Sequence, residues 1–422
     1  MTAAAVPRPA RLTARLSVMF ALETATTAAF VPLLSLHSRD GLHLTPYELS
    51  LVFAVGPITA LVGPPLAGWL ADRVLRAEHA LAAASVLRAV ALVFAARAIS
   101  FEALLLAMAC HGLFAAKTNV LVSTIAFHHL PDARRLGGTR VFGTLSWIVM
   151  VFLAMGFVGT GTTRANQLAN IPLCFYAGAT TAALQALYAL TLPPTSPATR
   201  SRGVLDALHA LRLLRSAPFA VALTVALLYG SLMQLNLMLQ GLYFAAEDGL
   251  GLSPAAAGRA STVSQALELM LFPFLATLLH RFGIRKVVLI GIAAWPLRYA
   301  AYLVGGPAWL VVGAQVLHGA NYVLGYTGLQ IAVELMAPRG FRASAQAAFM
   351  TASYGFGNLI GQLGCGVLLQ QAARAGGYDW PSIFAVPFVV AIVATALTAL
   401  GVREPLPPEP LPSEVLSPPQ SR

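Results

Sequence analysis

Long apolar runs, separated by short polar segments, recur along the whole chain. The runs begin near Thr13, Tyr47, His79, Phe101, Thr139, Asn170, Pro218, Ala255, Lys286, Pro307, Ala343 and Ile383. A helix needs about 20 apolar residues to cross a bilayer, and each run is long enough. The pattern therefore predicts an all-α integral membrane protein with about twelve transmembrane helices in two six-helix bundles.

Two segments lack this pattern and set the expected domain boundaries. The segment from Leu192 to Ser216 opens with a proline-rich break and continues as a basic amphipathic helix, as expected of a linker. The end of the chain is proline-rich, which is typical of a disordered tail. The predicted organisation is an N-terminal bundle over residues 1–192, a cytoplasmic linker over 193–216, a C-terminal bundle over 217–402 and a cytoplasmic tail over 403–422.

Composition and charge agree with a membrane location. The chain is 58% hydrophobic and 10% charged, whereas soluble domains are far richer in charge. We therefore expect the lipid bilayer as its surroundings. The net charge of +11 does not indicate nucleic-acid binding, because the basic residues are scattered between apolar runs instead of forming one face.

The loop charges also predict an orientation. Lys and Arg are concentrated in the loops on the same side as the N-terminus, and cytoplasmic loops are the ones that carry such an excess. Both termini are expected in the cytoplasm, with the chain crossing a bacterial-type inner membrane many times.

Several kinds of chemistry have no support in the sequence. The three cysteines lie in apolar runs without metal-ligand spacing, and no His, Cys or carboxylate cluster suggests a metal. A Walker motif is missing as well. We expect no cofactor, no metal and no catalytic residues. An enzyme would need a nucleophile or metal constellation and a receptor a soluble domain, so both are kept only as alternatives of a different class.

Some charged side chains are predicted to lie within or at the edge of the apolar helices. They are Glu23, Arg88, Lys117, Arg140, Glu268 and Arg298. A charge in the bilayer is costly unless it faces a polar interior, so these residues indicate a transport pathway. Glu23 and Lys117 fall at a similar depth, which predicts a pair that serves either as a structural link or in proton transfer. Arg88, Arg298 and His318 are interpreted as core polar groups.

The two halves of the chain echo each other at the turns after the second and eighth helices. Gly63–Arg76 occupies the first turn and Ala276–Lys286 the second, and such repeats build transporters that rock around a midplane site. The first turn resembles the signature loop of the major facilitator superfamily. In that loop a glycine permits close helix approach, and Asp and Arg latch neighbouring helices. The corresponding residues are Gly68, Asp72, Arg73 and Arg76.

Within that superfamily, nearly the whole chain is similar to the nucleoside:proton symporter family. The stretches that carry the resemblance include "RVFGTLSWI" in the fifth helix, "SQALE" in the eighth, "RFGIRKVVLIGIAAWPLRYAAYLVG" through the ninth and "FRASAQAAFMTASYGFGNLIG" in the eleventh. The resemblance implies a secondary transporter that imports nucleosides with protons by alternating access, and that can work as a monomer. The alternatives are an oligosaccharide, an aromatic acid or a drug as solute, or an uncoupled facilitator.

Two helices supply most of the candidate site. Arg140, Thr144 and Trp147 share one helix face at their i, i+4, i+7 spacing, although Arg140 alone would also fit a cation that reaches for the interface. The resemblance implies that the aromatic ring stacks on the base, a contact that any base permits. Gln265 and Glu268 are i, i+3 neighbours deep in the eighth helix. The resemblance assigns Glu268 to ribose binding and proton transfer, and a buried structural link is the alternative.

The seventh and tenth helices add polar and aromatic candidates. Gln234 and Asn236 have amides that suit a neutral polyhydroxylated solute, but they lie about 200° apart, so which of them faces inward is open. Tyr322 is an aromatic candidate in the tenth helix. Val323 stands where the family typically has an aspartate, and this departure leaves both a symporter and a facilitator open.

Overall fold

The computed structural model describes residues 9–70, 76–129, 136–195, 214–337 and 342–402. Within these ranges the chain is almost entirely helical and crosses the molecule twelve times, in two six-helix bundles, which confirms the predicted fold class. The remaining element is a hairpin of two short antiparallel strands, β1 (Ala373–Arg374) and β2 (Gly377–Tyr378). The predicted linker and tail fall largely outside the described residues, so the domain boundaries stay a prediction.

The first bundle contains the first six spans. Its elements are α1 (Pro9–Ala28) with α2 (Val31–Leu36) and the π-helical η1 (His37–Gly41), then α3 (Pro46–Leu70), α4 (Ala77–Ala96), α5 (Phe101–His129), α6 (Leu136–Gly159), and α7 (Arg164–Asn170) with α8 (Pro172–Ala189). Local sequence signals determine where some of these helices begin. At the start of α3, for example, Thr45 and Glu48 bind each other's backbone or hydroxyl groups in a capping box, which satisfies free helix N–H groups.

The second bundle contains the last six spans, and three of them are broken into several elements. They are α10 (Ala217–Ala245); α11 (Pro254–Ser261), α12 (Ser264–Leu271), η4 (Phe272–Phe274) and α13 (Leu275–Phe282); α14 (Ile284–Val304); α15 (Ala308–Ala314), α16 (Leu317–Gly319), η5 (Ala320–Thr327) and α17 (Gly328–Met336); α18 (Arg342–Met350), η7 (Thr351–Gly357) and α19 (Asn358–Gln371); and α20 (Trp380–Gly401). Apart from the sixth, the spans start within about four residues of the predicted positions, a normal error for such predictions.

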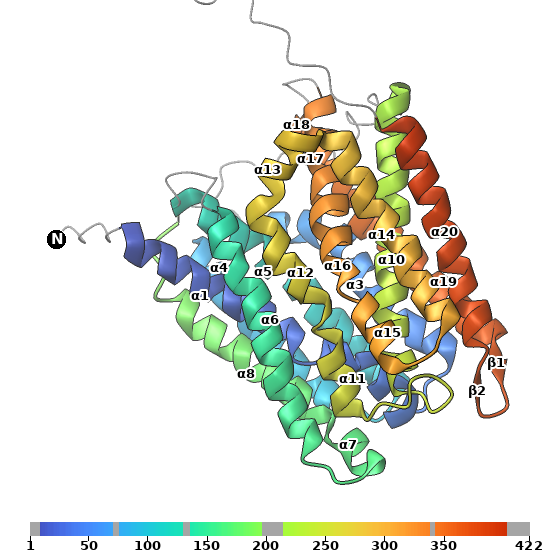
Figure 1. The fold of residues 1–422 in the computed structure, drawn as a ribbon. Coiled ribbons are helices and arrows are strands. Elements are labelled where there is room, and N and C mark those ends of the chain that lie inside the picture. Colours follow the sequence, from blue (N-terminus) through green and yellow to red (C-terminus); the bar gives the residue numbers. More distant parts are fainter. Residues whose placement is uncertain (1–8, 71–75, 130–135, 196–213, 338–341, 403–422) are drawn as a thin grey trace, which may run out of the picture.

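Within each bundle, the helices pack against one another. In the first, α1 lies against α6 and α8, and α4 against α5 and α8. In the second, α14 lies against α20 and η5, and α10 against α19 and η7. Figure 1 shows α1, α4 and α8 on one side and α14, α19 and α20 on the other. The bundles touch through α2 with α10 and α11, α3 with α19, α6 with α11 and α12, and α7 with α11.

Glycines permit several of these contacts between the bundles. A Cβ on Gly366 of α19 would come within 2.5 Å of the Cβ of Ser50 in α3, and one on Gly241 of α10 within 3.0 Å of the Pro32 carbonyl oxygen in α2. Small residues let helix backbones approach closely where no hydrophobic force drives them together. The bundles are therefore in close backbone contact at the end of the molecule that carries α7 and the β-hairpin, called here the hairpin end.

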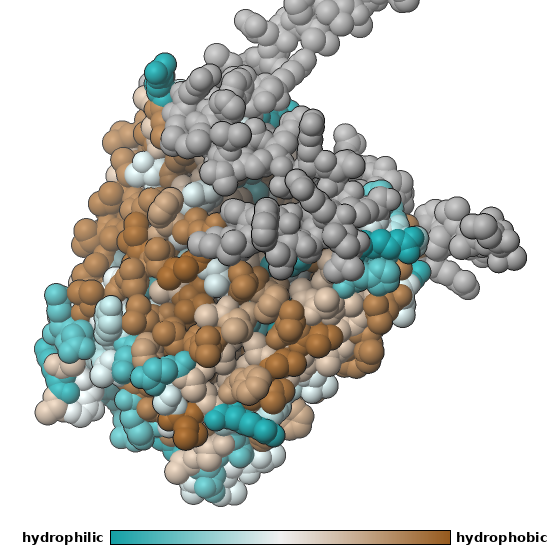
Figure 2. Space-filling view, turned by 180° about the vertical axis from the view of Figure 1, so that it is seen from behind, coloured by the Kyte–Doolittle hydropathy of each residue, from teal (hydrophilic) through white to brown (hydrophobic). Residues whose placement is uncertain are grey.

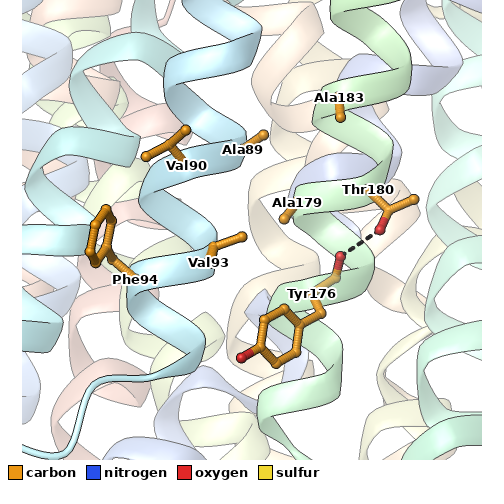
Figure 3. Close-up of a pocket in the computed structure, with 8 residues that line it drawn as sticks. All are labelled: Ala89, Val90, Val93, Phe94, Tyr176, Ala179, Thr180 and Ala183. Atoms are coloured by element: carbon orange, nitrogen blue, oxygen red, sulfur yellow. Dashed lines mark hydrogen bonds between the residues drawn. The ribbon is translucent and has the colours of Figure 1, made fainter.

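The outer surface is apolar, as a bilayer requires. Large side chains such as Phe94, Leu106 and Trp309 are 66, 67 and 73% exposed, and Figure 2 shows the hydrophobic residues as a broad brown surface. Within the described ranges, eight helices are long and apolar enough to cross a membrane. A groove of about 380 Å³ between α4 and α8 has a mainly apolar lining that includes Val93 and Ala179 (Figure 3). The chain is thus a multi-pass membrane protein.

Candidate substrate and proton site

The candidate site is centred on a contact between the two bundles. The hydroxyl of Thr144 in α6 donates a hydrogen bond of 3.0 Å to Oε1 of Glu268 in α12. Two motifs identified separately in the sequence, 124 residues apart, therefore meet in the structure. Glu268 is only 7% exposed, and a buried carboxylate is costly unless donors surround it. The contact makes Glu268 sensitive to the relative position of the bundles.

The break in the eighth span explains how α12 presents its polar residues. A turn at Thr262 and Val263 separates α11 from α12, and Pro273 follows as part of η4. Discontinuous helices of this kind build solute sites in transporters. Gln265 lies one turn before Glu268, and its buried Oε1 has no hydrogen-bond partner in the described part of the chain. Buried acceptors are normally hydrogen-bonded. A donor group on a solute could therefore bind to this oxygen.

An aromatic column from the tenth span lies beside Glu268. The ring of Tyr322 stacks on His318 with centroids 6.1 Å apart and on Tyr326 with centroids 5.7 Å apart, and the planes are nearly parallel in both pairs. Phe272 meets the Tyr322 ring edge-on at 6.0 Å. Tyr322 is half-buried. It is therefore a partly accessible aromatic side chain beside Glu268, with neighbouring rings packed against it.

The remaining residues predicted in α6 are placed only in part. Trp147 is half-buried and packs against the large apolar core. Arg140 lies in the same helix, but its side chain lies outside the described part of the structure. The structure thus brings Thr144 to Glu268, while the roles of Trp147 and Arg140 stay predictions.

The two candidate amides of the seventh span differ in their burial and partners. Asn236 is buried, donates to Gln240 at 3.1 Å and accepts from the Tyr302 hydroxyl of α14 at 3.4 Å. Gln234 is half-buried and accepts from Gln362 of α19. Both amides therefore bond within the second bundle, and Gln234 is the more accessible of the two. Which of them contacts the solute stays a prediction.

Glu23 has a different partner from the one suggested by the sequence. Its carboxylate pairs with Arg88 of α4, at 2.8 and 2.9 Å, and also accepts from Thr118 and Gln185. The predicted partner was Lys117, at a similar depth in α5. Depth counted along a helix does not specify direction around it, and Thr118, the neighbour of Lys117 in α5, donates to Glu23. The network favours a structural role for Glu23.

Val323 lies where a charged side chain would be costly. Val323 is fully buried in an apolar cluster that includes Leu275 of α13 together with Val287 and Ala294 of α14. An unpaired carboxylate would be costly there. His318 of the same span contacts Arg298 of α14, and the sequence led us to interpret both as core polar groups. Their only sequence signal was polarity within apolar runs.

The predicted latch lies mostly outside the described residues. Asp72 and Arg73 are not described, and Gly68 is placed in α3 without a description of its surroundings. Arg76 is exposed at the start of α4, with its Nε 3.7 Å from a carboxylate oxygen of Glu78. The latch therefore stays a prediction.

The two bundles, the broken eighth and tenth spans and the carboxylate between the bundles have the architecture of a secondary transporter of the major facilitator type. A family model described as "Nucleoside H+ symporter" matches residues 10–406. The chain belongs to this family.

Individual relatives span nearly the same length. YegT of Escherichia coli (strain K12) is 29% identical over 418 residues, covering 93% of this chain and 94% of that protein. Nucleoside permease NupG of the same organism is 25% identical over 355 residues, covering 80% and 83%. The crystal structure of nucleoside transporter NupG superposes with a TM-score of 0.79 at 23% identity, covering 92% of this chain and 98% of that one. At that identity, the likeness of the structures shows the fold alone.

Proposed function

We propose that this protein imports nucleosides together with protons, by alternating access of a site between its two bundles. The observation that carries the proposal is the hydrogen bond between Thr144 and Glu268, which connects the bundles through a protonatable group. Membership of the nucleoside:proton symporter family supports both the solute and the coupling ion.

In this mechanism Glu268 alternates between its ionised and protonated forms. As a carboxylate it accepts the Thr144 hydrogen bond from the opposite bundle. When Glu268 takes a proton, this charge-assisted bond weakens, because bonds to ions are about twice as strong as those between neutral groups. The solute base stacks on Trp147 and lies beside Tyr322, and Gln265 and Gln234 bind the polar groups. Rocking of the bundles then exposes the site on the other side.

We infer that the protein functions in the inner membrane of a bacterial-type cell, as a monomer with both termini in the cytoplasm. The excess of positive charge in the loops on the N-terminal side supports this orientation. In this orientation the hairpin end faces the outside of the cell.

The experiment is uptake of radiolabelled uridine by cells that lack their own nucleoside permeases, with and without a protonophore. We expect the protein to accumulate uridine, the protonophore to abolish accumulation, and Glu268→Gln to lose it. The matched control is Glu102→Gln, which changes an exposed carboxylate at the start of α5. Uptake that the protonophore does not change would indicate a facilitator. No uptake by a correctly inserted protein would exclude uridine as the solute.

A further inference from the structure

We propose that His318 is a positioning residue for Glu268: Arg298 fixes its ring as the neutral Nε2–H tautomer, which presents an N–H donor to the carboxylate. This inference rests on the proposed function for its role in transport, but its structural part does not depend on the solute. It assigns a role to two buried residues that the mechanism above does not use.

The tautomer follows from the donor inventory. Nδ1 of His318 lies 3.4 Å from a terminal nitrogen of Arg298, and a guanidinium has only donors. Nδ1 must therefore accept, so the single proton of a neutral ring is on Nε2. Nε2 is the ring atom that faces Glu268, with 4.0 Å between it and Oε2. Hydrogen bonds in unliganded sites are often longer than in the working complex.

The guanidinium is itself held in place. Nε and the second terminal nitrogen of Arg298 both donate to Oε1 of Gln315, at 2.8 and 2.6 Å, and Gln315 in turn donates to the Val311 carbonyl. The guanidinium carbon also lies 5.3 Å from the centroid of the Trp295 ring, in cation–π range. Arg298 is almost fully buried. It cannot turn away and release the tautomer without breaking these contacts.

The backbone brings the chain of residues together. Gly319, next to His318, packs so closely on α12 that a Cβ would lie 2.3 Å from the backbone nitrogen of Glu268. On the other side, the Asn321 amide donates to the Gly291 carbonyl of α14 at 2.9 Å. The tenth span is thus clamped between the eighth and ninth, and His318 lies between Glu268 and Arg298.

This arrangement accounts for coupling without an acid at Val323. Ionised Glu268 accepts a hydrogen bond from Thr144 of the first bundle, and the Nε2–H of His318 in the second bundle lies 4.0 Å from its other oxygen, placed to donate when the site closes around its solute. The fixed N–H of His318 stabilises the Glu268 carboxylate after Glu268 has released its proton. This is the support that a second polar group beside Glu268 has to provide. Coupling then runs through a single carboxylate, supported by a ring that keeps its own proton.

The first test reads the tautomer directly. Protein labelled with ¹⁵N-histidine is studied by NMR in detergent, and the His318 signals are assigned by their loss in His318→Gln. We expect a protonated Nε2 and a bare Nδ1, with the preference for that tautomer weakened in Arg298→Met. A proton on Nδ1, or an unchanged tautomer in Arg298→Met, would overturn the proposal. The result is valid whether or not uridine is transported.

The second test separates positioning from binding in proteoliposomes. His318→Phe keeps a flat ring without N–H groups, whereas His318→Gln keeps an N–H donor but cannot be protonated. We expect His318→Phe to lower proton-driven uridine accumulation about tenfold or more, the size expected when a hydrogen bond to a charged group is lost. Counterflow, which needs no net proton movement, should change little, and His318→Gln should keep most of the accumulation.

Each other outcome contradicts the role. If His318→Phe accumulates normally, the N–H is not needed. If His318→Gln is as defective as His318→Phe, the ring itself must titrate. If counterflow falls together with accumulation, His318 serves binding or folding. Failure of the unchanged protein in counterflow would instead reject the proposed solute, while the NMR result stands on its own.

A double-mutant comparison tests whether Arg298 acts through the ring. Removing Arg298 from the unchanged protein should lower proton-driven accumulation. In a His318→Gln background there is no tautomer to fix, so Arg298→Met should have little further effect. Independent effects add. Equal losses in both backgrounds would therefore show that Arg298 serves the fold alone, and would overturn the proposal that it acts through the His318 ring.

Discussion

At the scale of single residues, the sequence identified which side chains carry charge into the membrane but not which of them meet. Glu268 and Thr144 were placed at the site from their motifs, and the structure joins them. Glu23 was paired by depth with Lys117, whereas the structure gives it Arg88. Helical spacing fixes which residues of one helix share a face, and it contains no information about which helix packs there.

The Glu23 network predicts a strong effect on stability. In Arg88→Met the carboxylate of Glu23 loses its cation inside the first bundle, and breaking a buried pair costs ~3–5 kcal/mol. We expect a clearly lower midpoint of thermal unfolding for the purified protein, measured by intrinsic fluorescence in detergent. Glu23→Gln combined with Arg88→Met should recover part of the loss, because no unpaired charge is left. Equal midpoints for Arg88→Met and the unchanged protein would contradict a structural role for the pair.

The contact between the bundles predicts an effect on proton-driven uptake. Thr144→Val keeps the shape of the side chain and removes the donor to ionised Glu268, at a cost of ~1.5–3 kcal/mol for a bond to a charged group. Proton-driven uptake of uridine should fall about tenfold or more. Thr144→Ser keeps the hydroxyl and should stay close to the unchanged protein. A Thr144→Val variant with normal kinetics would remove Thr144 from the site.

At the scale of elements, apolar run length was enough to find the spans but not their internal breaks. The tenth and eleventh spans each contain a π-helical segment, η5 and η7, in glycine-rich sequence. A wider helical turn leaves the run of apolar residues unbroken, so hydropathy does not detect it. These breaks help to direct Tyr322 and its neighbours, which is why the aromatic column was not predicted.

The close approach of the eighth and tenth spans predicts that one methyl group disables the site. In Gly319→Ala the new Cβ would lie 2.3 Å from the Glu268 backbone nitrogen, so α16 and α12 must separate and His318 moves away from Glu268. We expect proton-driven uptake of uridine to be lost. Gly313→Ala is the matched control on the same span, since no atom of a neighbouring element lies within 4 Å of the position its methyl group would take. Similar uptake by the two variants would show that the close approach is not needed.

At the scale of the whole molecule, the sequence predicted two bundles and contained no information on where they touch. The structure shows them in contact near the hairpin end, where α7 meets α11 and the Arg39 guanidinium lies 5.9 Å from the centroid of the Tyr378 ring. These contacts come from residues without any recognisable motif. Packing between distant segments depends on shape, which a single sequence does not display. A state that opens at this end must break them.

The contact between α3 and α19 predicts how a substitution shifts the balance between states that are closed and open at the hairpin end. A methyl group on Gly366 would lie 2.5 Å from the Ser50 Cβ, an atom that no side-chain rotation moves away. Gly366→Ala should therefore destabilise the arrangement closed at the hairpin end and populate one in which the bundles are farther apart there. Spin labels at Ala165 and Ala375, exposed on α7 and in the hairpin, report this separation in a Cys110→Ser background. We expect a second, longer distance population in Gly366→Ala. Gly364→Ala on the same helix has no atom near its new methyl group and should match the unchanged protein; identical distances in both variants would show that α3 and α19 do not hold this end closed.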